Sequence, residues 1–340
     1  MMNLQTRYLG LDLRNPLVAS AGPLTQTVDG IRALADAGVG AVVMYSLFEE
    51  QLRAEVRKAE ALLDAHENSF AEALDYFPDT TMFTTRSVAH AYLTLVENGA
   101  KAIDVPLIAS LNGADTGGWV SFAKDLSDAG ASALELNIYL VPGDLGTRGT
   151  DVIERHLEIV RAVKASVSIP VSVKMSPYFS SVGSVALRIL DAGADGLVLF
   201  NRFLQPDIDL DTFNVSTTFA LSTPDEGRLP RTWIAALRKH TPASLAGSTG
   251  VETSADVIKY VLAGADVVMT TASLLRHGPG HVTVLLEGLE AWLSSKDLTL
   301  EAARGALAVP AELSANDYER AGYLAALDRA KSVYGSLTNA

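Results

Sequence analysis

Short apolar runs alternate with longer amphipathic stretches along most of this chain. Three of the runs, at 133–137, 170–174 and 196–201, end in an amide or amine side chain, namely Asn137, Lys174 and Asn201. Runs rich in valine and leucine are typical of strands buried on both faces of a parallel sheet. The pattern therefore predicts an α/β fold with these three polar side chains at strand ends.

The alternation repeats eight times. We expect strands at 15–22, 40–46, 105–111, 133–139, 169–176, 196–201, 243–247 and 266–271. We expect helices between and after them at 28–37, 119–129, 151–165, 182–192, 230–239, 254–263 and 281–294, with helix-like stretches at 48–65 and 87–98 in a less regular segment. Eight units favour a (β/α)8 TIM barrel. A doubly wound open sheet is the alternative, but no Gly-x-Gly-x-x-Gly follows the first run.

The last part of the chain has no strand pattern. Its apolar spacing indicates helices at 301–307 and 317–333, with Pro310 between them. We therefore expect residues 1–295 to form the barrel and residues 296–340 to form a helical extension packed on it.

Composition narrows the function classes. The 340 residues carry a formal net charge of −13 and no cysteine, which argues against nucleic acid as a partner and excludes thiolate chemistry. No apolar run reaches the roughly 20 residues of a membrane span, and the first residues lack the apolar core of a signal peptide. We expect a soluble cytoplasmic protein.

Small residues follow the seventh and eighth predicted strands. They let backbone N–H groups approach a ligand, and this pair of loops is the usual phosphate site of a TIM barrel. Tight turns with no ligand are the alternative. The residues that we expect to line the site are Gly247, Ser248, Thr249, Gly250, Thr270, Thr271 and Ala272.

Lys174 and the two asparagines are candidates for ligand binding. A lysine that points into a barrel needs an anionic partner, because an unpaired buried charge is costly. That partner is either a ligand or a carboxylate such as Glu135. Asn137 and Asn201 either bind a ligand or cap their own loops.

Several segments together resemble the dihydroorotate dehydrogenase family. They read Asn-Pro-Leu-Val-Ala-Ser-Ala-Gly at 15–22, Glu-Leu-Asn-Ile at 135–138, Pro-Val-Ser-Val-Lys at 170–174 and Ala-Gly-Ala-Asp-Val-Val-Met at 263–269, with Gly250 and Asp256 between the last two. The resemblance runs from about residue 8 to residue 295 in matching order.

The resemblance implies a TIM barrel that holds FMN. Lys174 matches the lysine beside flavin N1 and the C2 carbonyl, where a positive charge stabilises the reduced ring. Asn137 and Asn201 match asparagines that hold orotate. Gly247, Gly250 and Thr271 fall in the phosphate loops, and the first-strand loop that lies along the flavin matches Ala19, Ser20 and Gly22.

The chain departs from that family at three places. Leu140 stands where the family has its cysteine or serine base, and leucine cannot accept a proton. Tyr45 and Ser46 replace a Lys-Ser pair, and the segment 73–78 has no clear match to the family's asparagine loop. The branch is therefore divergent.

The departures from the family coincide with a distinct set of polar residues in this chain. They are Tyr45, Glu49, Glu50, Asn112, Tyr139, Arg202, Gln205, Asp207 and Asp209. We assign Asn112 and Arg202 to substrate binding and Tyr139 to proton transfer. Tyr139 could instead pack beneath its loop, Arg202 could pair with Asp207 or Asp209, and the two glutamates fit a solvated helix start.

The leading hypothesis is an FMN-dependent oxidoreductase that takes hydride from a ring substrate similar to dihydroorotate. One alternative is a non-redox barrel enzyme that acts on a phosphorylated metabolite, with Lys174 as a base or Schiff-base former. The other is a flavin-binding subunit without turnover that transfers electrons. We expect a small-molecule substrate, an electron acceptor that the sequence does not identify, no metal and no membrane, and soluble relatives suggest a homodimer.

Overall fold

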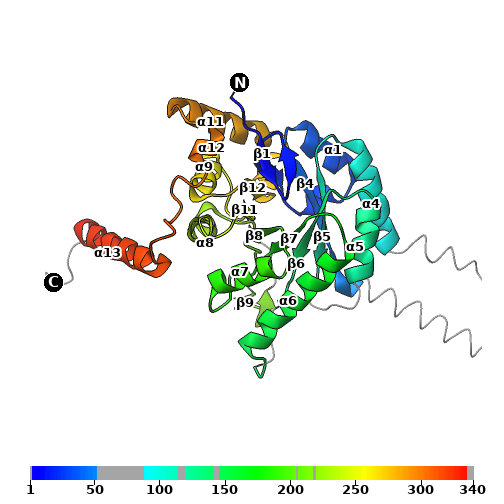
Figure 1. Ribbon diagram of the computed structural model, residues 1–340, viewed down its shortest axis with the longest axis horizontal. Coiled ribbons are helices and arrows are strands. Elements are labelled where there is room, and N and C mark those ends of the chain that lie inside the picture. The colour runs from blue at the N-terminus through cyan, green and yellow to red at the C-terminus, as the bar shows by residue number, and fades with distance from the viewer. Residues whose placement is uncertain are drawn as a thin grey trace, which may run out of the picture.

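Eight parallel strands close into a barrel in the computed structural model, which describes residues 2–51, 88–113, 119–140, 145–203, 206–216 and 220–334. The strands follow one another around the barrel in the order β11-β12-β3-β4-β5-β6-β7-β8 (Figure 1). Their bounds are β3 Leu17–Ala19, β4 Ala41–Phe48, β5 Leu107–Asn112, β6 Ala133–Asn137, β7 Val171–Lys174, β8 Gly196–Leu199, β11 Ser244–Gly247 and β12 Val267–Thr270. The predicted TIM barrel is confirmed.

Helices surround the barrel and cover the outer face of its sheet (Figure 1). They are α1 Val28–Asp36, α4 Val88–Ala102, α5 Trp119–Asp128, α6 Gly149–Ser166, α7 Val182–Asp191, α8 Arg228–Leu237, α9 Ser254–Ala263, α10 Ala272–His277 and α11 His281–Ser295. The sequence pattern missed the short α10. The predicted helix at 48–65 lies largely outside the described residues.

Each strand presents alternate side chains to two different cores. Leu134 and Leu136 of β6 pack outward into the large cluster between sheet and helices. Ala133 joins a smaller apolar cluster inside the barrel, and Glu135 and Asn137 share its face because side chains alternate along a strand. Polar residues of a strand are thereby directed into the barrel.

A hairpin that the sequence pattern did not predict closes the floor of the barrel. Strands β1 Thr6–Tyr8 and β2 Leu11–Leu13 pair antiparallel. Tyr8 belongs to the interior cluster and is fully buried, and the backbone N–H of Leu9 donates to the Ser244 hydroxyl at 2.8 Å. The hairpin fills the N-terminal end and leaves the opposite rim for a ligand.

The tail after α11 has two parts. Helix α12 spans Leu300–Ala303, so it ends four residues before the predicted helix end, and the backbone N–H of Gly305 donates to Val261 of α9 at 2.9 Å. Helix α13, Ala315–Tyr334, lies apart from the barrel in Figure 1, and its Tyr323 is 66% exposed. The division of the chain at residue 295 stays a prediction.

The connection after β8 contains a short hairpin and a short helix. The short strands β9 Asp207–Asp209 and β10 Asn214–Ser216 form a hairpin in this connection. The helix η2 Pro224–Gly227 leads from it into α8.

Within the described ranges, every helix is too short or too polar to span a bilayer.

The buried Tyr92 forms hydrogen bonds to the backbone where the register between β4 and β5 is irregular. The register between β4 and β5 shifts between Val43 and Ser46. The Tyr92 hydroxyl of α4 lies 2.8 Å from the Tyr45 carbonyl and 3.1 Å from the Ser110 carbonyl, which share its one proton, and it accepts from Ser110 N–H at 3.2 Å. Tyr92 thus bonds to the backbone of both strands beside the shift in register.

We expect Tyr92→Phe to lower the free energy of unfolding by about 1–3 kcal/mol, because buried backbone groups lose their partner. Urea unfolding measures this loss. The control is Tyr323→Phe on exposed α13, which should change stability by less than about 0.5 kcal/mol. Equal effects of the two variants would contradict this account.

Candidate functional site

A pocket of about 170 Å³ opens at the C-terminal ends of β3, β7, β8, β11 and β12. Its lining comes from loops that are far apart in the sequence. It is lined by Ser20, Ala21, Lys174, Phe200, Asn201, Arg202, Leu221, Ser222, Ser248, Thr249, Gly250, Val251, Met269, Thr270, Thr271 and Ala272. Most of the residues that the sequence assigned to a cofactor therefore meet at one place.

The loop after β3 forms one wall. Ala19 and Ser20 are buried, and the backbone N–H of Ser20 donates to the Thr270 carbonyl at 3.0 Å. A Cβ at Gly22 would lie 2.5 Å from Thr271 Oγ1, so this close approach requires glycine. Small residues bring the two loops together here.

Tyr260 of α9 anchors the loop after β11. Its hydroxyl is 2.7 Å from the carbonyls of both Ser248 and Thr249, and burial raises the pKa of Tyr260, so the hydroxyl keeps its proton. A Cβ at Gly247 would lie 2.2 Å from the Tyr260 ring. Thr249 has a φ of 78°, which is uncommon for a residue other than glycine. Tyr260 therefore holds the loop after β11 in one conformation from the side of α9.

The loop after β12 is held by its own hydroxyl groups. Thr270 Oγ1 lies 3.1 Å from the Val251 carbonyl and 2.9 Å from Ser273 Oγ. Thr271 follows at the start of α10, and Ala272 is buried. The loops after β11 and β12 therefore contact each other directly.

Lys174 is buried between three strands. Its Nζ lies 3.5 Å from Glu135 Oε1 of β6 and 3.5 Å from Ser20 Oγ after β3. The sequence left a ligand or a carboxylate as the partner of Lys174. The structure is compatible with both, because Lys174 lines the pocket and also pairs with Glu135. The chain itself compensates part of the charge of this lysine.

The asparagines at the strand ends form one group. Asn201 Nδ2 donates to Asn137 Oδ1 at 2.8 Å, and Asn137 stands beside both Asn112 and Lys174 in the strand register. Asn112 and Asn137 are buried. Three amides therefore gather next to the lysine, where they can donate to and accept from a planar polar ring.

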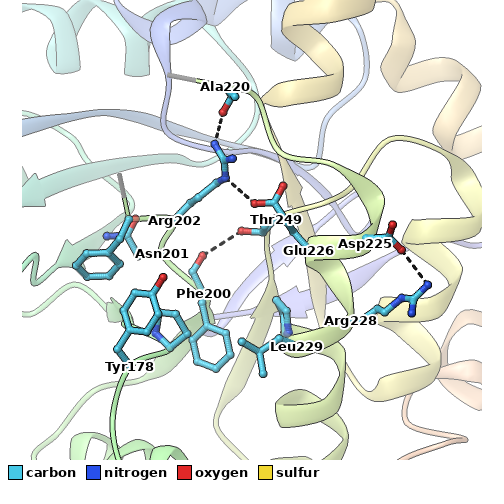
Figure 2. A pocket seen from close by; sticks show the side chains of 13 residues that line it. Tyr178, Phe200, Asn201, Arg202, Ala220, Asp225, Glu226, Arg228, Leu229 and Thr249 are labelled. Atoms are coloured by element: carbon cyan, nitrogen blue, oxygen red, sulfur yellow. Dashed lines mark hydrogen bonds and ion pairs between the residues drawn. The ribbon is translucent and has the colours of Figure 1, made fainter. Parts of the chain in front are cut away.

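Arg202 lies between two pockets. It lines the small pocket and also a larger cavity of about 440 Å³ next to it, which Tyr178, Phe203 and Leu229 help to enclose. Its Nε donates to Glu226 Oε1 at 2.8 Å and its Nη1 to the Ala220 carbonyl (Figure 2). Glu226 is thus an acidic partner of Arg202 that the sequence did not suggest, and the pairing with Asp207 or Asp209 stays a prediction.

Aromatic rings pack together at the rim beside the asparagines. The Tyr139 ring stacks on Phe203 with centroids 4.3 Å apart, and Tyr178 meets Phe203 edge-on at 5.5 Å. Tyr139 and the adjacent Leu140 are both half-buried. Tyr139 therefore packs in its loop, and it also stands two residues beyond Asn137.

Two features differ from the sequence pattern: Leu221 and Ser222 line the pocket, and one glutamate predicted to be solvated is buried. Gly250 N–H donates to Ser222 Oγ at 3.3 Å, and Arg276 donates to the Ser222 carbonyl at 2.8 Å. The only local signal was the capping box that begins at Thr223. Glu50 is exposed as predicted, but Glu49 is buried. Gln205 and the segment 73–78 lie outside the described residues.

Comparisons with known proteins identify relatives of this chain. A sequence model described as dihydroorotate dehydrogenase matches residues 83–293. The catalytic subunit of dihydroorotate dehydrogenase B (NAD(+)) from Methanothermobacter thermautotrophicus is 26% identical over 310 residues, which cover 86% of this chain and 94% of that protein. The protein of the same name from Methanocella arvoryzae is 28% identical over 297 residues, covering 86% of this chain and 93% of its own. The one from Listeria welshimeri is 34% identical over 171 residues, covering 48% of this chain and 56% of its own.

We expect Tyr260→Phe to weaken the binding of FMN by about tenfold, which corresponds to about 1.4 kcal/mol. Without the hydroxyl, the loop at 248–249 loses its anchor and must be ordered when the ligand binds. Titration of the cofactor-free protein with FMN measures the affinity. Tyr318→Phe on exposed α13 should leave it unchanged, and an equal affinity of all three proteins would refute the anchoring role.

Proposed function

This chain belongs to the dihydroorotate dehydrogenase family, and from this premise we propose that its rim oxidises a small ring compound with FMN held in the pocket after β3, β11 and β12. It is an FMN-dependent oxidoreductase that resembles the dihydroorotate dehydrogenases, which act on CH–CH donors. The observation that supports the placement is Lys174, a buried cation that lines the pocket between loops of small residues. Family membership argues against the non-redox alternative.

The pocket fits a phosphate-bearing cofactor. A Cβ at Gly22 or Gly247 would collide with Thr271 or Tyr260, so small residues let the loops after β3, β11 and β12 pack closely around the pocket that Lys174 lines. We assign Thr249, Gly250 and Thr271 to the phosphate end and Ser20 and Lys174 to the ring end. These assignments rest on one observation: all five residues line the same pocket.

FMN, when bound, supplies a ring that accepts two electrons from a carbon–hydrogen bond of the substrate. In this proposal Lys174 places a positive charge where negative charge develops on the reduced ring. Asn137 and Asn201 are already hydrogen-bonded to each other, and they orient the polar groups of the substrate without large rearrangement.

The proton that leaves the substrate needs a different acceptor in this chain. Leu140 occupies the position of the family's base and has no proton-accepting atom. We propose the Tyr139 oxygen as the acceptor, because Tyr139 adjoins that position in the chain and stacks on Phe203, which holds its ring. The step requires the phenolate form, in which Tyr139 has first released its own proton to solvent and then takes the substrate proton to become a neutral phenol. The substrate is then a ring related to dihydroorotate, and dihydroorotate itself should react slowly.

A second chain is part of the proposed function. The relatives are named as catalytic subunits of an NAD(+)-linked enzyme, and such a name implies a further subunit that exchanges electrons with NAD(+). We propose a comparable partner here, in a cytoplasmic assembly built on a homodimer. Co-purification of a second chain tests this, and an assembly of this chain alone that reduces NAD(+) would refute it.

The purified protein should be yellow, with an absorption band at about 450 nm from oxidised flavin. A visible spectrum before and after addition of FMN measures this directly. A protein that shows no flavin band and binds no added FMN would overturn the proposed function.

We expect Leu140→Cys to speed the anaerobic reduction of bound FMN by dihydroorotate about 100-fold, since a positioned general base contributes roughly 10²–10⁴ in rate. Stopped-flow bleaching of the flavin band measures the rate. Bleaching at the same rate in the parent protein would show that Leu140 does not occupy the place of the base.

Two variants control this experiment. Leu145→Cys puts the same thiol on the same loop at a fully exposed position and should leave the rate unchanged. Tyr139→Phe should slow the parent protein further but have little effect in the Leu140→Cys background. A loss of equal size in both backgrounds would assign Tyr139 to packing.

A further inference from the structure

Glu135 is a fully buried carboxylate in the middle of the barrel. Its Oε1 lies 3.5 Å from Lys174 Nζ, and its exposed fraction is 0%. Among the described side chains, neither of its oxygens makes a hydrogen bond of acceptable geometry. The ion pair with Lys174 is therefore the interaction that offsets the burial of this charge.

The surroundings of Glu135 do not replace that partner. Ser110 and Ser172 flank it in the strand register, and the Ser172 hydroxyl donates to the Leu134 carbonyl instead. The Tyr8 hydroxyl is also fully buried on the floor side and lies near Ser172. Burial, and then the negative charge of Glu135, raise the pKa of Tyr8, so Tyr8 stays neutral.

Lys174 in turn is held from two sides. Glu135 lies below its Nζ in the barrel, and Ser20 Oγ stands 3.5 Å away at the rim. A lysine side chain has several rotatable bonds and loses much freedom when it is fixed. Coulombic attraction to an anion on the neighbouring strand favours the position of the ammonium group at the mouth of the barrel.

We propose that Glu135 is a positioning residue that fixes Lys174 at the cofactor pocket and balances its charge. The pair carries no net charge, so Glu135 limits how strongly Lys174 favours a reduced, anionic cofactor. The first half of this proposal stands on the described contacts alone, and the second half rests on the proposed function.

A double-mutant cycle on the full chain tests the pair after removal of any bound flavin. The variants are Glu135→Gln, Lys174→Met and the two combined, and the measurement is the midpoint of thermal unfolding. Each single change leaves a buried charge without its partner, so both midpoints should fall. The midpoint of the combined variant should be no lower than that of the less stable single variant. Losses that add would overturn the proposal.

Ser172→Ala is the matched control for coupling. Ser172 faces the same interior layer as Glu135 and is equally buried, but its hydroxyl bonds to Leu134. Its loss of stability should add to that of Lys174→Met. If Glu135→Gln does not fold, a combined variant that folds supports the pair, and one that also fails overturns it.

The reduction potential of bound FMN gives a readout that a merely structural role would not move. Glu135→Gln keeps the shape and removes the charge, so we expect the equilibrium to shift toward reduced flavin by about tenfold, or about 30 mV for a two-electron couple. Glu135→Asp keeps the charge and should stay near the parent potential. An unchanged potential in Glu135→Gln would overturn the tuning role.

The two proposals fail in different ways. Additive losses in the cycle would refute the pair even in a protein that binds FMN. Coupled losses in a protein that binds no FMN would refute the proposed function and the tuning role while they confirm the pair.

Discussion

Closing eight parallel strands into a ring leaves an interior that must be filled, and the rest of this structure depends on how it is filled. The floor takes Tyr8, Leu9 and Leu13 from the N-terminal hairpin, and apolar side chains follow above it. Higher up stands Glu135, and the rim carries Lys174. A buried charge is costly unless it is paired, and Glu135 and Lys174 pair with each other just below the rim.

The rim is divided into two sides by Lys174. On one side the loops after β3, β11 and β12 are built from small residues and held by Tyr260 and by hydroxyl groups. On the other side are the asparagine pair and the stacked rings of Tyr139 and Phe203. The first side suits a phosphate and a flat cofactor, and the second suits a polar ring.

The two sides have diverged from the family to different extents. The proposed cofactor side keeps the small residues and the lysine that the family resemblance implies. On the proposed substrate side, the resemblance implies that Leu140 stands in place of a base and Tyr45 in place of a lysine. A barrel permits this because each strand end contributes its loop independently to a common rim. Cofactor binding can therefore persist while the proton chemistry changes.

The sequence by itself determined the barrel, its strand positions and the polar residues at the strand ends, because continuous apolar runs must be buried on both faces. It also limited the partners of Lys174 to a ligand or a carboxylate. The tertiary structure decided that Glu135 pairs with Lys174, that Arg202 turns to Glu226, and that Glu49 is buried. It also placed a hairpin in the floor. These contacts join residues from different strands and loops, so they depend on register and closure, which no local pattern of the chain encodes.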